Sequence, residues 1–276
     1  MTYFVSFRTS VSGGEVGDPK VLVADETAEN YRQVPEFGLV SLFAEKDILF
    51  ATHGFNVNQA EGVRSLARLE ARLNPVGAEL FVGVLWPGDY WLPVVNYPTE
   101  AADAVKCGQK LADFCAKYAS RSNSISFLSH SLGGRLILEA VAQLDTRAKT
   151  VCLTAAAVDR DCLDAQYADA VSNAETISNL SSRRDMVLRL AYPVGDFLSD
   201  IFYDDDDALQ SALGYLGPKS PWPALVRPKK IPEALDYGHG DYLPPSDQQS
   251  PLSGLKWENA ADFMFRAFRN QAQTWP

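Results

Sequence analysis

Residues 124–140 have the sequence Ser124-Ile-Ser-Phe-Leu-Ser-His-Ser131-Leu-Gly-Gly-Arg-Leu-Ile-Leu-Glu-Ala140, and this stretch decides the fold. A short apolar run ends at small residues around Ser131, and an apolar helical pattern follows. This order is typical of a nucleophile elbow, a strand–serine–helix turn so tight that the positions two residues before and after the serine need small side chains. Gly133 meets this need, and Ser129 stands in place of the first glycine of the motif. The stretch predicts that Ser131 is a nucleophile.

Apolar runs and helical patterns alternate on both sides of this elbow. Short apolar runs, typical of strands buried on both faces, occupy residues 47–52, 80–85, 124–128, 150–156 and 175–180. Helical patterns occupy residues 59–73, 99–118 and 134–144. Strands that alternate with helices predict a mostly parallel central sheet with helices on both faces. Before them, residues 2–9 and 20–24 predict an antiparallel hairpin joined by a turn at 11–19.

The length of 276 residues fits one large α/β domain or two small ones. The sequence contains no internal repeat and no clear interdomain linker, so we expect a single domain over residues 1–276. The stretch 186–236 differs from the rest, because it contains the acidic run 204–207 and then several prolines. We expect a surface excursion there, with the acidic run solvated, and a lid or pocket wall is the open alternative for the aromatic, proline-rich part.

The formal net charge of −10 argues against a nucleic-acid backbone or an anionic membrane surface as a partner. None of the four cysteines forms a C-x-x-C pair, so we expect free, mostly buried thiols and neither a metal nor a cofactor. Free thiols suit a reducing cytoplasm. The N-terminus lacks the features of a signal peptide, and no run reaches the ~18 apolar residues of a membrane span. These features together predict a cytoplasmic protein.

A serine nucleophile needs a general base, and the sequence contains three histidines. His130 is adjacent to Ser131 in the elbow, so its side chain should project away from the nucleophile. His53 directly follows a predicted strand, where we expect a structural role. His239 lies between two glycines in a predicted exposed loop. Elimination favours His239 as the base, and the alternative is an ordinary solvated histidine.

The base needs an orienting acid, which in α/β-hydrolases lies between the serine and the histidine in chain order. Asp185 fits best, because it lies in the loop that leaves the last predicted strand. There it would fix the tautomer of His239 and stabilise the imidazolium ion. An ordinary loop or helix-capping role is the alternative for Asp185. Asp159 and Asp161, which follow the preceding predicted strand, remain open as rival acids.

An oxyanion hole needs two backbone N–H groups near the developing negative charge. Leu132 should supply one, because it follows the nucleophile at a helix N-terminus whose dipole favours negative charge. The other should come from the loop His53-Gly54-Phe55-Asn56. Phe55 is the preferred donor, because Gly54 gives its backbone room and a helix capped by Asn58 holds the loop. A plain turn with a helix cap is the alternative for this loop.

Three stretches resemble the α/β-hydrolase superfamily. They are Ile48-Leu-Phe-Ala-Thr-His-Gly-Phe-Asn-Val-Asn58, Val84-Leu-Trp-Pro-Gly88 and Leu128-Ser-His-Ser-Leu-Gly-Gly-Arg135. Within the superfamily they most resemble the bacterial group known as domain of unknown function 900, which shares the His-Gly-Phe-Asn loop, the Trp-Pro strand end, the Ser-His-Ser-x-Gly elbow and a late histidine. The resemblance implies an α/β-hydrolase fold with Ser131 as nucleophile, Asp185 as acid and His239 as base.

We therefore expect a serine hydrolase, and specifically a carboxylesterase that acts on small-molecule acyl or aryl esters through an acyl-enzyme on Ser131. An apolar pocket should form from aromatic residues, namely Phe55, Trp86, Tyr90, Trp91, Tyr97 and Trp222, with His53, Asn56 and His130 nearby. A thioesterase or lipase is an alternative, and so is a non-catalytic binding protein that kept the hydrolase fold. A dehalogenase or epoxide hydrolase would need an aspartate at position 131.

Overall fold

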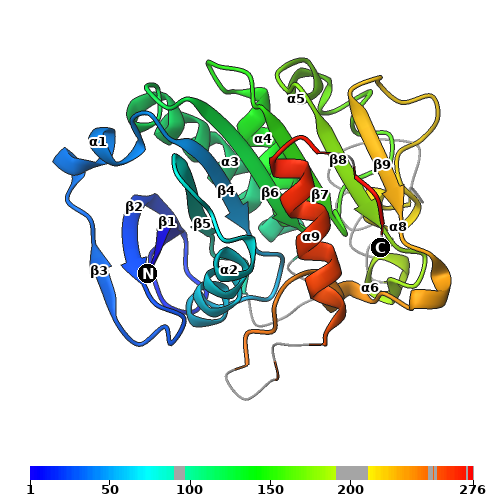
Figure 1. Cartoon of the computed structure of the whole chain (residues 1–276), viewed down its shortest axis with the longest axis horizontal. Helices are drawn as coiled ribbons and strands as arrows, with labels where there is room; N and C mark the ends of the chain where they lie inside the picture. Colours follow the sequence, from blue (N-terminus) through cyan, green and yellow to red (C-terminus); the bar gives the residue numbers. More distant parts are fainter. Residues whose placement is uncertain (90–96, 191–210, 248–250, 252–253, 272, 276) are drawn as a thin grey trace.

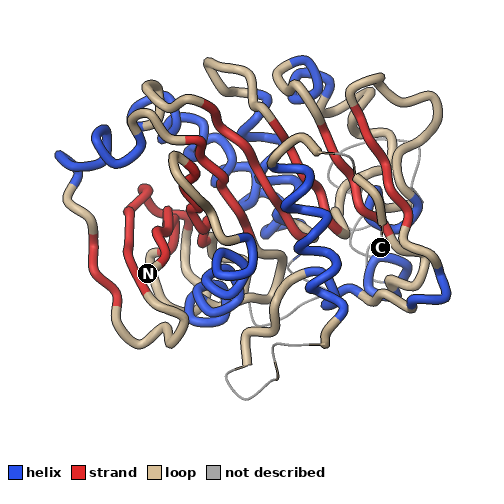
Figure 2. Tube along the Cα trace, in the orientation of Figure 1, coloured by secondary structure: helices blue, strands red, loops and turns tan. Residues whose placement is uncertain are grey.

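A nine-stranded sheet forms the centre of the protein (Figures 1 and 2). The computed structural model describes residues 1–89, 97–190, 211–247, 251, 254–271 and 273–275. The strands follow the spatial order β3-β2-β1-β5-β4-β6-β7-β8-β9. Their bounds are β1 Thr2–Arg8, β2 Val16–Ala24, β3 Tyr31–Gln33, β4 Asp47–Thr52, β5 Glu79–Leu85, β6 Ser124–His130, β7 Thr150–Thr154, β8 Ile177–Ser181 and β9 Val226–Lys230.

The sheet is parallel from β1 to β9 and antiparallel only at its N-terminal edge. β1 pairs with β2 and β2 with β3 in antiparallel register, whereas β1 pairs with β5 in parallel. The remaining neighbours, from β5 through β4, β6, β7 and β8 to β9, are all parallel. The carboxyl ends of these parallel strands therefore meet along one edge of the sheet, where ligands bind in open α/β sheets.

Helices cover both faces of the sheet (Figure 1). α2 (Gln59–Leu73) and α9 (Lys256–Phe268) lie on one face, and α3 (Tyr97–Tyr118) and α4 (Gly133–Ala142) lie on the other. The shorter helices are α1 Leu39–Phe43, α5 Ala168–Ser172, α6 Met186–Leu190 and α8 Leu213–Leu216, with 3₁₀ turns η1 Glu36–Gly38, η2 Glu233–Leu235 and η3 His239–Tyr242. The predicted α/β fold, with its mostly parallel sheet and antiparallel N-terminal hairpin, is confirmed.

A local sequence signal sets the start of α2. α2 occupies the predicted residues 59–73, because Asn58 accepts a hydrogen bond from the Glu61 N–H and the Glu61 side chain accepts one from the Asn58 N–H. This capping box ends the preceding loop and starts the helix. The hairpin differs in one respect, since β2 begins at Val16, inside the predicted turn 11–19.

Part of the stretch 186–236, where the sequence predicts a surface excursion, belongs to the core and to the sheet. Ala212 and Leu213 are fully buried, and β9 at Val226–Lys230 pairs with β8 as the last strand of the sheet. The strand escaped prediction because Pro228 and its charged neighbours break the apolar pattern of a buried strand. Proline is tolerated there because β9 is an edge strand, whose outward N–H groups need no partner. Residues 191–210, including the acidic run, lie outside the described residues.

All four cysteines are buried and free, as the sequence predicts. Burial raises the pKa of each thiol, so these thiols stay protonated and pack as small apolar groups. Among the described residues, no helix combines the length and the apolar character that crossing a membrane requires.

Candidate active site

A continuous chain of hydrogen bonds joins the three residues that the sequence predicts as nucleophile, base and acid. His239 Nε2 lies 2.8 Å from Ser131 Oγ, and His239 Nδ1 lies 2.8 Å from Asp185 Oδ2. The Asp185 side chain is fully buried, whereas 18% of the His239 side chain is exposed. Because a carboxylate can only accept, Nδ1–H of His239 donates to Asp185 and leaves Nε2 to accept the Ser131 hydroxyl proton.

The three residues come from one edge of the sheet. Ser131 directly follows β6, Asp185 follows β8, and His239 begins η3 after β9. These three strands are parallel to one another through β7, so their carboxyl ends lie together. The fold thus brings together side chains that are 54 and 108 residues apart in the sequence.

Ser131 has the strained backbone of a nucleophile elbow. Its φ angle is 55°, in the left-handed region that a serine rarely adopts. Backbone hydrogen bonds on both sides hold it there: its N–H donates to Thr154, and its carbonyl accepts from Gly134 and Ala157. Gly133 is required because a Cβ atom would lie 2.5 Å from the His53 carbonyl oxygen.

Asp185 is held by the start of α6. Its Oδ1 atom accepts the N–H of Leu188 at 3.0 Å, while Oδ2 faces His239. One carboxylate oxygen thus caps a helix while the other contacts the histidine. The capping role and the acid role that the sequence offers as alternatives are therefore compatible. Asp161, one of the rivals, forms an ion pair with Lys219 at 3.4 Å, and Asp159 pairs by a backbone bridge with Ala212.

His130 supports the loop that carries His239. Its Nε2–H donates to the backbone carbonyl of His239 at 2.8 Å, and the two rings lie 4.8 Å apart. Burial, aided by the nearby His239, lowers the pKa of His130 to about 3. His130 therefore stays neutral at ordinary pH and fixes the backbone that carries His239.

The loop between β4 and α2 lies directly against the elbow. A Cβ atom at Gly54 would be 2.8 Å from the Ser131 Cβ, so only glycine permits this approach. Asn56, at φ 56°, uses its N–H to bond Gly88 at 2.5 Å. Within the described residues, the N–H groups of Phe55 and Leu132 make no hydrogen bond to another backbone group. These two amides are the pair that the sequence predicts as the oxyanion hole.

His53 and Trp86 are buried and hold this loop through hydrogen bonds to its backbone. Nδ1–H of His53 donates to the Gly54 carbonyl at 2.8 Å, and its ring stacks on Trp86 at 5.8 Å. Trp86 is fully buried and donates from Nε1 to the His53 carbonyl at 3.1 Å. Burial lowers the pKa of His53 to about 4, so this ring is a neutral packing group. Both residues lie in the core beneath the loop.

The other predicted pocket residues have mixed positions. Phe55 is partly buried against the core, Asn56 is exposed, and Trp222 has 43% of its surface exposed. Tyr90 and Trp91 lie outside the described residues, and the Tyr97 side chain does too. A small apolar cavity between Leu49, Leu73, Glu79 and Phe268 lies elsewhere, because Glu79 begins β5 at the opposite edge of the sheet. It is not part of this site.

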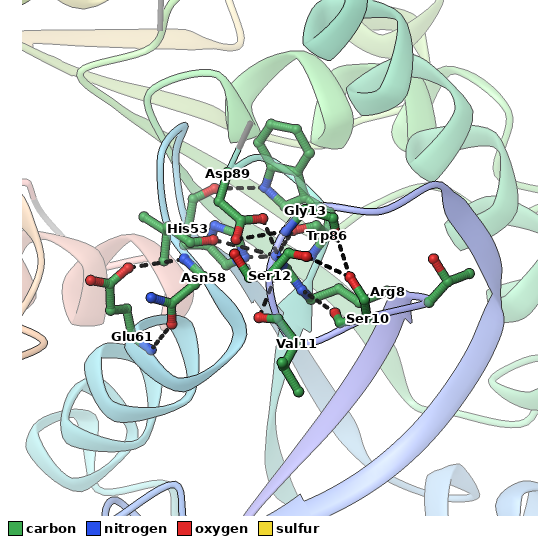
Figure 3. A network of polar contacts seen from close by, with 12 residues as sticks. Arg8, Ser10, Val11, Ser12, Gly13, His53, Asn58, Glu61, Trp86 and Asp89 are labelled. Carbon is green, nitrogen blue, oxygen red and sulfur yellow. Dashed lines mark hydrogen bonds and ion pairs between the residues drawn. The ribbon is translucent and has the colours of Figure 1, made fainter. Parts of the chain in front are cut away.

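Arg8 and Asp89 form a buried ion pair beside the His53 loop, and no motif in the sequence marks them as functional (Figure 3). The one sign of such a role in the sequence is that Arg8 is a charged residue near the end of the predicted strand at 2–9. Within the described parts of the chain, no cluster of three or more His, Cys, Asp or Glu side chains is arranged to hold a metal ion.

The family model for α/β hydrolases of unknown function, DUF900, matches residues 39–199, more than half of the chain. The chain belongs to this family. DUF900 membership and the nine-stranded sheet together make the protein a hydrolase of the α/β fold. The matched region contains Ser131 and Asp185, whereas His239 follows it.

Solved structures of esterases are similar to this DUF900 protein. Esterase PE8 is 13% identical with a TM-score of 0.47, covering 83% of this chain and 94% of its own. Inhibited esterase B from Lactobacillus rhamnosis is 12% identical with a TM-score of 0.45, covering 97% and 86%. Carboxyl esterase 2 from the mycorrhizal fungus Tuber melanosporum is 12% identical with a TM-score of 0.44, covering 94% and 82%. No curated protein matches the sequence.

Proposed function

We propose that this DUF900 protein is a serine hydrolase that cleaves small-molecule carboxylic esters through an acyl-enzyme on Ser131. The observation that carries the proposal is the unbroken hydrogen-bond chain from Ser131 Oγ through His239 to Asp185. A base in contact with the nucleophile, itself oriented by a third group, is the arrangement that activates a serine.

In the acylation step, Ser131 Oγ forms a bond to the ester carbonyl carbon while His239 Nε2 takes the hydroxyl proton. Buried Asp185 stabilises the imidazolium ion that results. The carbonyl oxygen becomes an oxyanion that accepts hydrogen bonds from the Phe55 and Leu132 N–H groups. When the tetrahedral intermediate collapses, His239 returns the proton to the departing alkoxide and an alcohol leaves.

In the deacylation step, water replaces the alcohol. His239 Nε2 takes a proton from the water as its oxygen attacks the acyl carbon, and the same two N–H groups hold the second oxyanion. Collapse then breaks the bond to Ser131 Oγ, which recovers its proton from His239 as the carboxylic acid departs. Three side chains and two backbone amides complete the cycle.

The preference for acyl or aryl esters is supported by apolar side chains beside the acid. Met186 and Val187 directly follow Asp185, and each has 49% of its surface exposed. Phe55 adds a partly buried aromatic ring on the loop that faces Ser131. Such surfaces favour an apolar acyl or aryl group over a charged one.

A series of p-nitrophenyl esters of graded acyl length tests the proposal. We expect saturable hydrolysis by the wild-type protein and losses in kcat of about 10⁴-fold or more for Ser131→Ala and for His239→Ala. The double variant should lose little more than either single variant, since the two residues act as a unit. Ser120→Ala, an exposed serine after α3 at the opposite edge of the sheet, should keep wild-type rates.

Two results would contradict this proposal. If His239→Ala kept near-full activity, another group would be the base. If the wild-type protein hydrolysed no ester in the series and Ser131 reacted with no serine-directed probe, a non-catalytic binding role on the hydrolase fold would be the better account.

A further inference from the structure

Arg8 lies at the end of β1, and its side chain has no exposed surface. It forms an ion pair with Asp89, whose side chain is only 6% exposed. The guanidinium group also donates hydrogen bonds to four backbone carbonyl oxygens. They are those of Trp86 at 2.7 Å, Ser10 at 3.2 Å, and Val11 and Val57 at 3.4 Å (Figure 3). We refer to Arg8 and Asp89 as the clasp.

The clasp ties three segments of the chain together. They are the hairpin turn at 10–13, the loop at 53–58 and the end of β5 with its extension at 86–89 (Figure 3). Asp89 completes the network by accepting the Gly13 N–H at 3.0 Å through its second carboxylate oxygen. Backbone hydrogen bonds run beside the clasp, from Asn56 to Gly88 and from Gln59, at the start of α2, to Val11.

The pairing of β1 with β2 is irregular beside Arg8. Ser6 pairs with Lys20, but Arg8 pairs with Val16, so the register between β1 and β2 shifts between these two pairs. Irregular strand pairing is common next to active sites. Without the shift, Arg8 would stand opposite Asp18, an exposed partner on β2. The irregularity accompanies an arginine whose guanidinium group donates to all three segments.

A purely stabilising role explains the clasp poorly. Burying two charges costs several kcal/mol, and well-packed apolar residues of similar volume often stabilise a protein as well or better. What an ion pair with several directional hydrogen bonds adds is a fixed geometry. Arg8 bonds the Val57 carbonyl of the loop that also carries Phe55. At Gly54 the same loop lies directly against Ser131.

We infer that Arg8 and Asp89 are positioning residues that hold the Phe55 N–H at the oxyanion of the transition state. The inference rests on the proposed ester hydrolysis and extends it to residues remote from the substrate. Since hydrogen bonds to an oxyanion act mainly in the transition state, loosening the clasp should lower kcat and leave KM nearly unchanged.

The test compares Arg8→Lys and Asp89→Asn with the wild-type protein on one p-nitrophenyl ester. Both substitutions keep the approximate volume but break the fork-shaped contact of guanidinium with carboxylate. We expect kcat to fall between about 10- and 100-fold at similar KM. The affinity for a trifluoromethyl ketone, which Ser131 converts to a tetrahedral oxyanion, should fall by a similar factor. Titration with a fluorophosphonate counts the active sites, so misfolded protein does not distort kcat.

The matched control is Arg269→Lys. Arg269 also pairs with a carboxylate, donating to both oxygens of Glu79, but Glu79 begins β5 at the opposite edge of the sheet. This variant should lose stability without losing kcat. Unchanged kcat and ketone affinity in both clasp variants would overturn the inference while the proposed function stands. A wild-type protein that neither hydrolyses the ester nor reacts with the fluorophosphonate would instead overturn the proposed function, and the inference with it.

Discussion

Ser131 carries backbone strain that its proposed chemistry explains. A φ angle of 55° destabilises a residue other than glycine by of order 1 kcal/mol. The strained residue is the one whose Oγ is hydrogen-bonded to His239. Strain at a single residue, supported by hydrogen bonds to Thr154, Gly134 and Ala157, is the pattern expected where geometry serves function rather than stability.

Replacing Ser131 with glycine should therefore separate stability from activity. Glycine adopts a positive φ without steric cost. We therefore expect Ser131→Gly to be more stable than Ser131→Ala, by about 1 kcal/mol in unfolding free energy. Both variants should be inactive toward esters. Urea denaturation of the two proteins measures the difference. A Ser131→Ala protein that is as stable as Ser131→Gly would mean that the elbow is not strained.

The neutral histidines predict a pH dependence of stability. Burial lowers the pKa of His53 from 6.5 to about 4, and that of His130 to about 3. Near pH 5 the unfolded chain protonates these rings and the folded protein does not, so stability is lost as pH falls below about 6.5. For His53 alone the loss approaches about 2 kcal/mol at pH 5.

Urea denaturation at pH 7, 6 and 5 measures this dependence, in a range above the pKa values of most carboxylates. The variant His53→Asn, although less stable overall, should show a flatter dependence than the wild-type protein. Equal unfolding free energies at pH 7 and pH 5 in the wild-type protein would contradict the buried, neutral state of these rings.

At the scale of single elements, the sequence predicted those whose signals are local. The capping box at Asn58 and Glu61 marked the start of α2, and the small residues around Ser131 marked the strand–helix turn. β9 was missed because Pro228 and its charged neighbours match no buried-strand pattern. Its place in the sheet depends on pairing with β8, a non-local contact that local sequence does not encode.

The cap of α2 gives a direct prediction at this scale. The Asn58 side chain accepts the Glu61 N–H at 3.0 Å, so Asn58→Ala should lower the unfolding free energy by about 1 kcal/mol. Asn58→Asp keeps a side-chain acceptor and should be nearly neutral. Thermal or urea denaturation of both variants tests this, and equal losses in the two would show that the cap contributes nothing.

At the scale of the whole molecule, the site is assembled from distant parts of the chain. The order of serine, acid and base could be predicted because the hydrolase fold fixes it. The choice of Asp185 over its rivals could not be settled, since it depends on where the loops after β7 and β8 end in space. The clasp was missed for a similar reason, because Arg8 and Asp89 are 81 residues apart.

The continuous core predicts that the chain unfolds as one unit. Phe4 in β1 precedes the region matched by the family model, and Phe263 in α9 follows it, yet both are fully buried in the same core. Phe4→Leu and Phe263→Leu should each lower the unfolding free energy by about 1–2 kcal/mol. Each variant should still unfold in a single urea transition, at a lower midpoint than the wild-type protein. Tryptophan fluorescence and circular dichroism should give coincident curves. Two separate transitions would contradict a single domain.

The central claim is that Ser131 is the nucleophile of a hydrolase. Mass spectrometry of the protein after reaction with a fluorophosphonate tests it most directly. Trypsin releases residues 122–135, a peptide with several serines, and fragmentation can locate the adduct within it. The account predicts one phosphonyl group per chain, on Ser131, and none in Ser131→Ala. An unlabelled wild-type protein, or an adduct on another residue that survives in Ser131→Ala, would contradict it.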